Sequence, residues 1–174
     1  TRELDYTCTL REFSINDREE KILEEIIKEK PDVVAFSTYI WNVEMIARLS
    51  ELIKTVNSDI EIMYGGPEVS YDSSNILKEL RGDYIIQGEG EETYKEFIQY
   101  KLGERELTDI RGLYYKVEGN VYSNGTRPLM DMNKIVFPYE KDEVLDNKIV
   151  YYEGSRGCPF NCKYCLLSTT HGVR

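Results

Sequence analysis

The spacing of apolar residues in the first hundred positions is typical of helices that each pack one face against a core. Between 17 and 30, Ile22, Leu23, Ile26 and Ile27 recur three and four positions apart. The same period returns at 42–56 and at 91–102. We expect helices over these three ranges, the first capped by Asp17 and the second by Asn42, with Gly103 ending the third. The inward residues of the third helix are expected to be Tyr94, Phe97, Ile98 and Leu102.

Short apolar runs separate these helical patterns. They lie at 33–38, 61–65 and 84–88, and a further short helix, "SSNILKEL", stands between the second and third runs. Runs of this length between turn residues are typical of buried strands. Strands that alternate with helices predict an α/β fold, in which a mostly parallel sheet is flanked by helices.

After Gly103 the pattern changes. The stretch "GLYYKVEGNVYSNGTRP" predicts a β-hairpin with its turn near Gly119 and Asn120. A connector follows, and "KIVYYEGSRG" predicts a new strand that leads into three cysteines. We therefore expect an α/β domain over 1–103, an appended hairpin and linker over 104–147, and the start of a different domain over 148–174.

Composition narrows the class of protein. The 174 residues are 41% hydrophobic and 31% charged, which favours a packed core over disorder. The net charge of −10, without a basic stripe, argues against a nucleic-acid partner. No apolar run approaches the roughly 20 residues that span a bilayer, and the first residues carry no signal-peptide pattern. Clustered cysteines without a disulfide framework favour a cytoplasmic setting.

Small and polar residues stand where the predicted parallel strands end. They are Ser37 and Thr38, Gly65 and Gly66, and the stretch Gly88-Glu89-Gly90. Ligands of open parallel sheets bind at this edge, where glycine lets the backbone approach closely and leaves N–H groups free to donate. Any one of these stretches is also an ordinary strand-to-helix turn, but three together favour a ligand site. The spacing matches neither the full dinucleotide fingerprint nor the P-loop.

Three cysteines lie close together in "SRGCPFNCKYCLLSTTHGVR". Cys158, Cys162 and Cys165 follow a C-x3-C-x2-C spacing that suits thiolate ligation of a metal. A structural zinc site needs four ligands, and His171 could supply the fourth. The alternative is an iron–sulfur cluster on three cysteines, which leaves one iron open for a substrate or cofactor.

The segment "CPFNCKYC" resembles the CxxxCxΦC signature of the radical S-adenosylmethionine enzymes, where Φ is an aromatic residue. This resemblance implies that Cys158, Cys162 and Cys165 hold a [4Fe–4S] cluster whose open iron binds S-adenosylmethionine. It also implies that Tyr164 packs near the adenine. One electron, from a donor such as flavodoxin or ferredoxin, would drive the cleavage of S-adenosylmethionine.

The preceding part resembles the cobalamin-binding domain of B12-dependent radical S-adenosylmethionine proteins. The resemblance rests on "VVAFSTYIWNVEMIARL", "YGGPEVS" and "DYIIQGEGEETYKEFI". It implies a flavodoxin-like (Rossmann-like) domain that binds cobalamin, and an enzyme that is typically a methyltransferase acting on an unactivated centre. The residues expected to line the cobalamin site are Ser37, Thr38, Gly65, Gly66, Gly88, Glu89 and Gly90.

Two departures from this family limit the expectation. The Asp-x-His-x-x-Gly motif, which supplies a cobalt ligand in many B12 domains, is absent, and His171 is the only histidine. The first strand and helix of the family domain are also missing, and in a flavodoxin-like order 2-1-3-4-5 that strand would be central. We therefore expect a fragment that is inactive alone, with Cys8 buried in a strand. The alternative is a non-catalytic flavodoxin-like binding module that carries a terminal zinc knuckle.

Overall fold

The computed structural model describes the chain except for residues 1–3, 137–138, 140–151, 161, 166–171 and 174. The chain divides into two compact units, 1–128 and 129–174. Each unit is treated by itself below. Among the described residues, no helix is long and apolar enough to cross a membrane.

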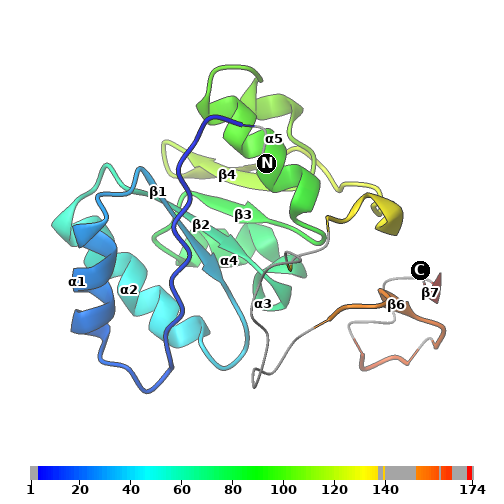
Figure 1. Cartoon of the computed structure of the whole chain (residues 1–174), viewed down its shortest axis with the longest axis horizontal. Helices are drawn as coiled ribbons and strands as arrows, with labels where there is room; N and C mark the ends of the chain where they lie inside the picture. Colours follow the sequence, from blue (N-terminus) through cyan, green and yellow to red (C-terminus); the bar gives the residue numbers. More distant parts are fainter. Residues whose placement is uncertain (1–3, 137–138, 140–151, 161, 166–171, 174) are drawn as a thin grey trace. The chain divides into compact units, whose positions relative to one another are not determined.

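The first unit is built on one five-stranded sheet in the order β1-β2-β3-β4-β5 (Figure 1). The strands are β1 (Val33–Ser37), β2 (Glu61–Gly65), β3 (Tyr84–Ile86), β4 (Leu113–Val117) and β5 (Asn120–Ser123). The first three are parallel, whereas β4 pairs antiparallel with β3 and with β5. The predicted hairpin is therefore present, and it extends the main sheet as two further strands.

Helices cover both faces of this sheet (Figure 1). They are α1 (Glu19–Lys28), α2 (Val43–Val56), α3 (Pro67–Ser70), α4 (Ser73–Glu79) and α5 (Glu91–Lys101), with a short 3-10 turn, η1, at Leu107–Asp109. The predicted α/β class and the three long helices are confirmed. The single turn α3 was not predicted, because four residues carry no readable helical period.

Successive side chains of the central strands point to opposite faces, which divides the core in two. Ile62, Tyr64 and Ile85 pack with residues of α2, α3 and α4, and the apolar stripe of α1 lies against them. Met63 and Tyr84 instead pack with Phe97 of α5 and its neighbours. This period-two arrangement explains why both faces of β2 and β3 are apolar in sequence.

The helix ends differ in detail from expectation. The Asp17 carboxylate does not cap α1; its Oδ2 accepts from the Ser14 N–H at 2.7 Å, and α1 begins two residues later. Asn42 stands at the N-cap of α2, yet its Oδ1 accepts from Tyr39 N–H at 2.7 Å. Both side chains organise the preceding turn, which competes with capping for the same oxygen. Leu102 is 41% exposed, so its inward placement was also wrong.

The N-terminal segment was expected to place Cys8 in a buried strand, and this is wrong. Residues 6–14 have no regular secondary structure, and Cys8 is exposed. Among the described residues, β1 pairs with β2 alone, so the segment forms no ladder with the sheet. It is held instead by Tyr94 of α5, whose side chain hydrogen-bonds with Tyr6 and Cys8 and whose pKa is raised mainly by burial.

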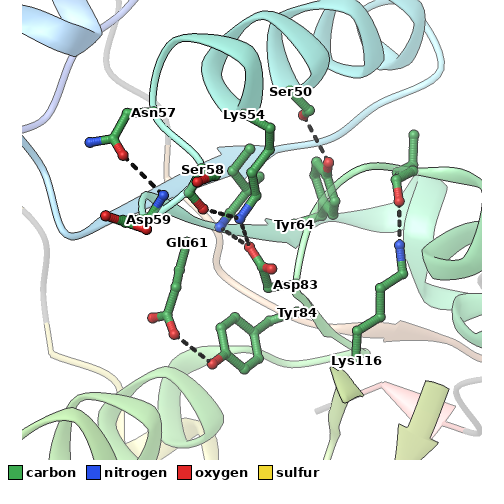
Figure 2. A network of polar contacts seen from close by, with 12 residues as sticks. Ser50, Lys54, Asn57, Ser58, Asp59, Glu61, Tyr64, Asp83, Tyr84 and Lys116 are labelled. Carbon is green, nitrogen blue, oxygen red and sulfur yellow. Dashed lines mark hydrogen bonds and ion pairs between the residues drawn. The ribbon is translucent and has the colours of Figure 1, made fainter. Parts of the chain in front are cut away.

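A network of polar contacts fixes the starting ends of β2 and β3 (Figure 2). Asp83 accepts from the Ile62 N–H at 2.7 Å and pairs with Lys54 at 2.7 Å. The Tyr84 hydroxyl donates to Glu61 at 3.0 Å. These contacts satisfy charges that are partly withdrawn from water, and they anchor the strands at the end away from the predicted ligand site.

The second unit contains little regular structure in its described part. A 3-10 turn, η2, lies at Met132–Lys134, and β6 (Gly157–Cys158) pairs antiparallel with β7 (Gly172–Val173). Residues 148–151 of the predicted strand lie outside the described residues, and 152–156 have no strand pairing. The predicted boundaries at 103/104 and 147/148 stay predictions, the second of them within residues that are not described.

Candidate functional site

The register of the parallel strands aligns the predicted ligand turns at one edge of the sheet. Ser37, the last residue of β1, pairs with Gly65, the last residue of β2. The ladder between β2 and β3 continues this alignment with Tyr64 opposite Ile85. The turns that follow β1, β2 and β3 therefore lie at the same edge of the sheet, as the sequence predicted.

Backbone hydrogen bonds connect the first of these turns to the second. Thr38 N–H donates to Gly65 O at 2.6 Å, and Glu68 N–H donates to Thr38 O at 3.4 Å. Asn42 supports the first turn from the other side, because its Nδ2 donates to Ser37 O at 2.9 Å. The two turns are thus held as one backbone unit.

Gly66 is required by the close approach of these two turns. Its φ is +110°, a conformation that side chains rarely adopt, and a Cβ there would lie 2.5 Å from Thr38 O. Gly65 is different, since a Cβ there would meet nothing within 4 Å. Gly65 therefore leaves open space, and Gly66 allows its backbone to contact the backbone of Thr38.

The second turn is connected to the third through Ser70, the last residue of α3. The Ser70 hydroxyl donates to Gly66 O at 2.8 Å and accepts from Gly88 N–H at 3.1 Å. The Ser70 carbonyl accepts from Gln87 Nε2 at 3.0 Å. Hydrogen bonds therefore join all three predicted turns.

The third turn combines an open glycine with the start of α5. Gly88 has a φ of +74°, and a Cβ there would meet nothing within 4 Å. Gly90 is the N-cap residue of α5, and its carbonyl accepts from Tyr94 N–H at 2.7 Å. Glu89 between them is partly buried. The open space at Gly65 and at Gly88 leaves backbone accessible at two of the three turns.

Two buried polar atoms at this edge have no hydrogen-bond partner among the described residues: Thr38 Oγ1 and Gln87 Oε1. Leaving such an atom unpaired costs roughly 1–3 kcal/mol, so a partner outside the described chain is expected. Cobalamin carries peripheral amide groups that donate and accept hydrogen bonds. The unpaired oxygens and the open glycine backbone are therefore compatible with that ligand.

An aromatic pair stands in the loop after β1. The rings of Tyr39 and Trp41 stack with centroids 4.5 Å apart, and Trp41 is exposed. Ile40 between them is also exposed. The two rings add exposed apolar surface to the loop that also contains Thr38. The sequence pattern did not indicate this pair.

The three clustered cysteines lie in the second unit. Cys158 belongs to β6, and Cys165 N–H donates to Cys162 O at 3.1 Å across a tight turn. All three are partly buried and outside any disulfide. Among the described residues, no three His, Cys, Asp or Glu side chains are grouped closely enough to hold a metal ion. Three thiolates are chemically suited to hold an iron–sulfur cluster. Their role as its ligands stays a prediction.

Tyr164, predicted to pack near an adenine, is 93% exposed. Its ring is therefore available for a stacking contact, and no described neighbour covers it. Its place beside the adenine stays a prediction.

Sequence reasoning missed Ser70 and Gln87, and it assigned Asn42 as a helix cap without its contact to Ser37 O. A signal for Ser70 was present: a serine four residues after a glycine, with proline at the first helical position, can bond back to that glycine's carbonyl. For Gln87 no local signal existed. An amide near a turn is common, and its partners are identified only once the fold brings the turns together.

Comparison with known proteins identifies the first unit. Residues 1–98 match the family model described as the B12 binding domain. An uncharacterized methyltransferase of Pyrococcus horikoshii is 31% identical over 86% of this chain, which spans 34% of that protein. The cobalamin-dependent radical SAM methyltransferase TokK of Streptomyces tokunonensis is 25% identical over 78% of this chain and 22% of its own length.

A cyclase is also among the relatives. The anaerobic magnesium-protoporphyrin IX monomethyl ester cyclase of Rubrivivax gelatinosus is 26% identical over 84% of this chain and 29% of its own length. The chain thus spans between about a fifth and a third of the length of these curated relatives. Proteins named for different reactions share the part that this chain represents.

Solved structures show the same fold. The cobalamin-dependent S-adenosylmethionine radical enzyme OxsB, with aqua-cobalamin and S-adenosylmethionine bound, has a TM-score of 0.56 at 21% identity, covering 66% of this chain and 16% of that one. TsrM from Kitasatospora setae, with cobalamin and a [4Fe-4S] cluster, has a TM-score of 0.54 at 18% identity, covering 71% and 24%. With its aligned turns and its family match, the chain belongs to the B12-binding domain family.

Proposed function

We propose that this chain is the cobalamin-binding part, with the cluster-binding loop, of a cobalamin-dependent radical S-adenosylmethionine enzyme, and that the enzyme is a methyltransferase. The observation that carries the proposal is the edge at which three turns, joined by hydrogen bonds, present open glycine backbone beside the unpaired Thr38 Oγ1. The family match supports the identity of the ligand.

The residues of the chain bind and orient the ligand at this edge. Gly65 and Gly88 leave room for close approach of the ligand to backbone, and Thr38 and Gln87 supply the unpaired oxygens. Ser37, Glu89 and Gly90 belong to the same turns. Bound cobalamin supplies a cobalt centre that can carry a methyl group, and the protein fixes its position relative to the rest of the enzyme.

The cysteine loop has a separate role in the proposal. Cys158, Cys162 and Cys165 are the ligands of a [4Fe–4S] cluster, which supplies one-electron chemistry toward S-adenosylmethionine when it is bound. Tyr164 contacts the adenine through its exposed ring. An electron donor such as flavodoxin or ferredoxin is the expected redox partner of the longer protein.

A matched pair of glycine substitutions tests the cobalamin site. Gly88 and Gly103 have nearly the same φ, +74° and +77°, and a Cβ at either meets nothing within 4 Å. Each change to Ala should cost about 1 kcal/mol of folding stability, because both impose the same backbone strain. Only Gly88→Ala should weaken hydroxocobalamin binding, by tenfold or more, since only Gly88 lies at the proposed edge.

Titration of hydroxocobalamin into the 174-residue chain and both variants, followed by visible absorbance, gives the result. Equal affinities for the two variants, or no binding to the unmodified chain, contradict the proposal. Gly66 is a poorer position for this test. Its Cβ would meet Thr38 O, so a substitution there disturbs the turn as well as the ligand.

Metal analysis tests the proposed cluster. After anaerobic reconstitution with iron and sulfide, the chain should bind both and show broad visible absorbance. Zinc alone in the purified and reconstituted chain would contradict the cluster and favour a zinc site. Transfer of a methyl group from S-adenosylmethionine is to be measured on the longer gene product that contains this chain.

A further inference from the structure

One hydroxyl at the end of α3 bonds to two turns that belong to different strands. Ser70 Oγ donates to Gly66 O at 2.8 Å and accepts from Gly88 N–H at 3.1 Å. A serine hydroxyl has one proton to donate and lone pairs to accept with, so both contacts can exist together. Ser70 is partly buried, which lowers the competition from water.

The Ser70 main chain adds a third contact to the same turn. Its carbonyl accepts from Gln87 Nε2 at 3.0 Å, and the Gln87 N–H donates to Gly112 O at 2.8 Å, at the start of the hairpin. The turn after β3 is therefore held from two directions, by α3 on one side and by the hairpin on the other.

The sheet itself does not hold these two turns together. The ladder between β2 and β3 pairs Met63 with Tyr84 and Tyr64 with Ile85, and it ends before either glycine turn. Gly66 and Gly88 both have a positive φ and no side chain to restrict the backbone. Their relative position beyond the ladder thus depends on contacts of the kind that Ser70 makes.

We propose that Ser70 is a positioning residue, which fixes the distance between the Gly66 and Gly88 turns and so prepares the edge of the sheet for cobalamin. The identity of the ligand in this inference rests on the proposed function, whereas the contacts of Ser70 do not. A site that is already ordered loses less conformational entropy when its ligand binds. Removal of the Ser70 hydroxyl should therefore weaken cobalamin binding, although the hydroxyl itself does not contact the ligand.

Ser73 provides a matched control on the next helix. Its hydroxyl donates to Val69 O at 2.7 Å, four residues back, as the Ser70 hydroxyl does to Gly66 O. Ser73 is buried and its bond stays within the local chain. Ser70→Ala and Ser73→Ala therefore remove the same kind of local bond, but only Ser70→Ala also removes the acceptor for the Gly88 N–H.

The experiment measures amide hydrogen exchange by NMR in the ligand-free 174-residue chain, and then hydroxocobalamin affinity by absorbance titration. In Ser70→Ala, exchange at Gly88 should accelerate about tenfold and cobalamin affinity should fall about tenfold, as expected for one lost hydrogen bond. Ser73→Ala should change both by less than about twofold. Ser70→Thr, which keeps a hydroxyl, should restore most of the protection at Gly88.

The outcomes separate the two proposals. Unchanged exchange at Gly88 in Ser70→Ala overturns the contact, whatever the affinity. Faster exchange with unchanged affinity overturns the positioning role. If the unmodified chain binds no cobalamin, the proposed function and the ligand part of this inference fail together. The exchange data then still decide whether Ser70 holds the two turns.

Discussion

The two units of this chain differ in where their apolar residues lie. In residues 1–128 the core contains fully buried side chains from β2, β3, α2, α4 and α5, such as Tyr64, Ile85 and Phe97. Among the described residues after 128, none is buried, and Tyr152, Phe160 and Tyr164 are exposed. The first unit is organised by packing, whereas the described part of the second unit, which holds the three cysteines, has no buried core.

This difference indicates that the two proposed cofactors depend on the chain in different ways. The turns of the first unit are held in place by a sheet and by hydrogen bonds that exist without a ligand. The three cysteines have no such framework among the described residues, and a bound metal would have to supply much of their order. Changes in the first unit should therefore act on the fold or on a site that exists before the ligand binds, whereas loss of a cysteine in the second unit should act by removing a metal ligand.

The largest expected effect is the loss of the metal. Cys158→Ala, Cys162→Ala and Cys165→Ala should each abolish the visible absorbance of the reconstituted cluster, because each removes one of three ligands. Cys8→Ala should keep it and cost about 0.5 kcal/mol or less, since Cys8 is exposed and lies in the other unit. Loss of the cluster in Cys8→Ala, with retention in any of the others, would reverse the assignment.

The next effect compares one apolar side chain from each unit. Ile85→Ala removes a fully buried side chain from β3 and should lower the free energy of unfolding by about 3 kcal/mol. Phe160→Ala removes a larger side chain that is 67% exposed and should change it by less than about 0.5 kcal/mol. Urea denaturation followed by circular dichroism measures both. A cost above about 1 kcal/mol for Phe160→Ala would mean that its ring is packed in solution.

Alkaline pH should destabilise the first unit through its buried tyrosines. Burial raises the pKa of Tyr64 from 10.0 to about 12, and burial also raises the pKa of Tyr84, with the Glu61 carboxylate adding to the shift. The neutral phenol is favoured in the folded state, so this stability is present below pH 10 and is lost as the pH rises toward 12. For Tyr64 alone the loss between pH 9 and 11 should be about 1 kcal/mol.

Tyr64→Phe is the control for this pH dependence. It removes the hydrogen bond to Ser50 Oγ at 2.8 Å and should cost about 1 kcal/mol at neutral pH. Its free energy of unfolding should then fall less steeply than that of the unmodified chain between pH 9 and 11. If the free energy of unfolding falls equally steeply with pH in the two proteins, Tyr64 is not the source of the pH dependence.

The smallest expected effect is a gain in stability at the hairpin. The turn between β4 and β5 consists of Glu118 and Gly119, with φ of +50° and +80°, a two-residue turn that favours Asn-Gly. Glu118→Asn should raise the free energy of unfolding by about 0.5 kcal/mol, because asparagine adopts a positive φ at lower cost. A loss of stability in the same urea measurement would mean that the Glu118 side chain makes a contact that offsets its strain.

Periodicity predicted most of the first unit, because its helices and strands each bury a regular set of apolar residues. The local sequence was enough to predict both the apolar stripe from Ile22 to Ile27 and the turn beside Gly119. The position of Cys8 was not, because whether a segment joins a sheet depends on an available strand edge elsewhere in the chain. Asp17 and Asn42 were assigned as caps for a different reason: a side-chain oxygen near a helix start can also accept from the preceding turn, as both do in this fold.

The candidate site was predicted in outline only. The rule for parallel sheets placed the three turns at one edge, and the strand register agrees with it. The contacts that connect the turns, above all those of Ser70, depend on how α3 sits between β2 and β3. The spacing of Gly66 and Ser70 indicates the bond between them, but no spacing in the sequence encodes the bond from the Gly88 N–H to Ser70.

The direction of the hairpin has a practical consequence for engineering. Because β4 runs antiparallel to β3, with Tyr115 opposite Tyr84, its turn at Glu118 and Gly119 lies toward the starting end of β3. The glycine turns lie at the opposite end of the same strand. A fluorophore, affinity tag or inserted peptide between residues 118 and 119 would therefore be attached to the sheet and would report on the domain from a point remote from the proposed ligand edge.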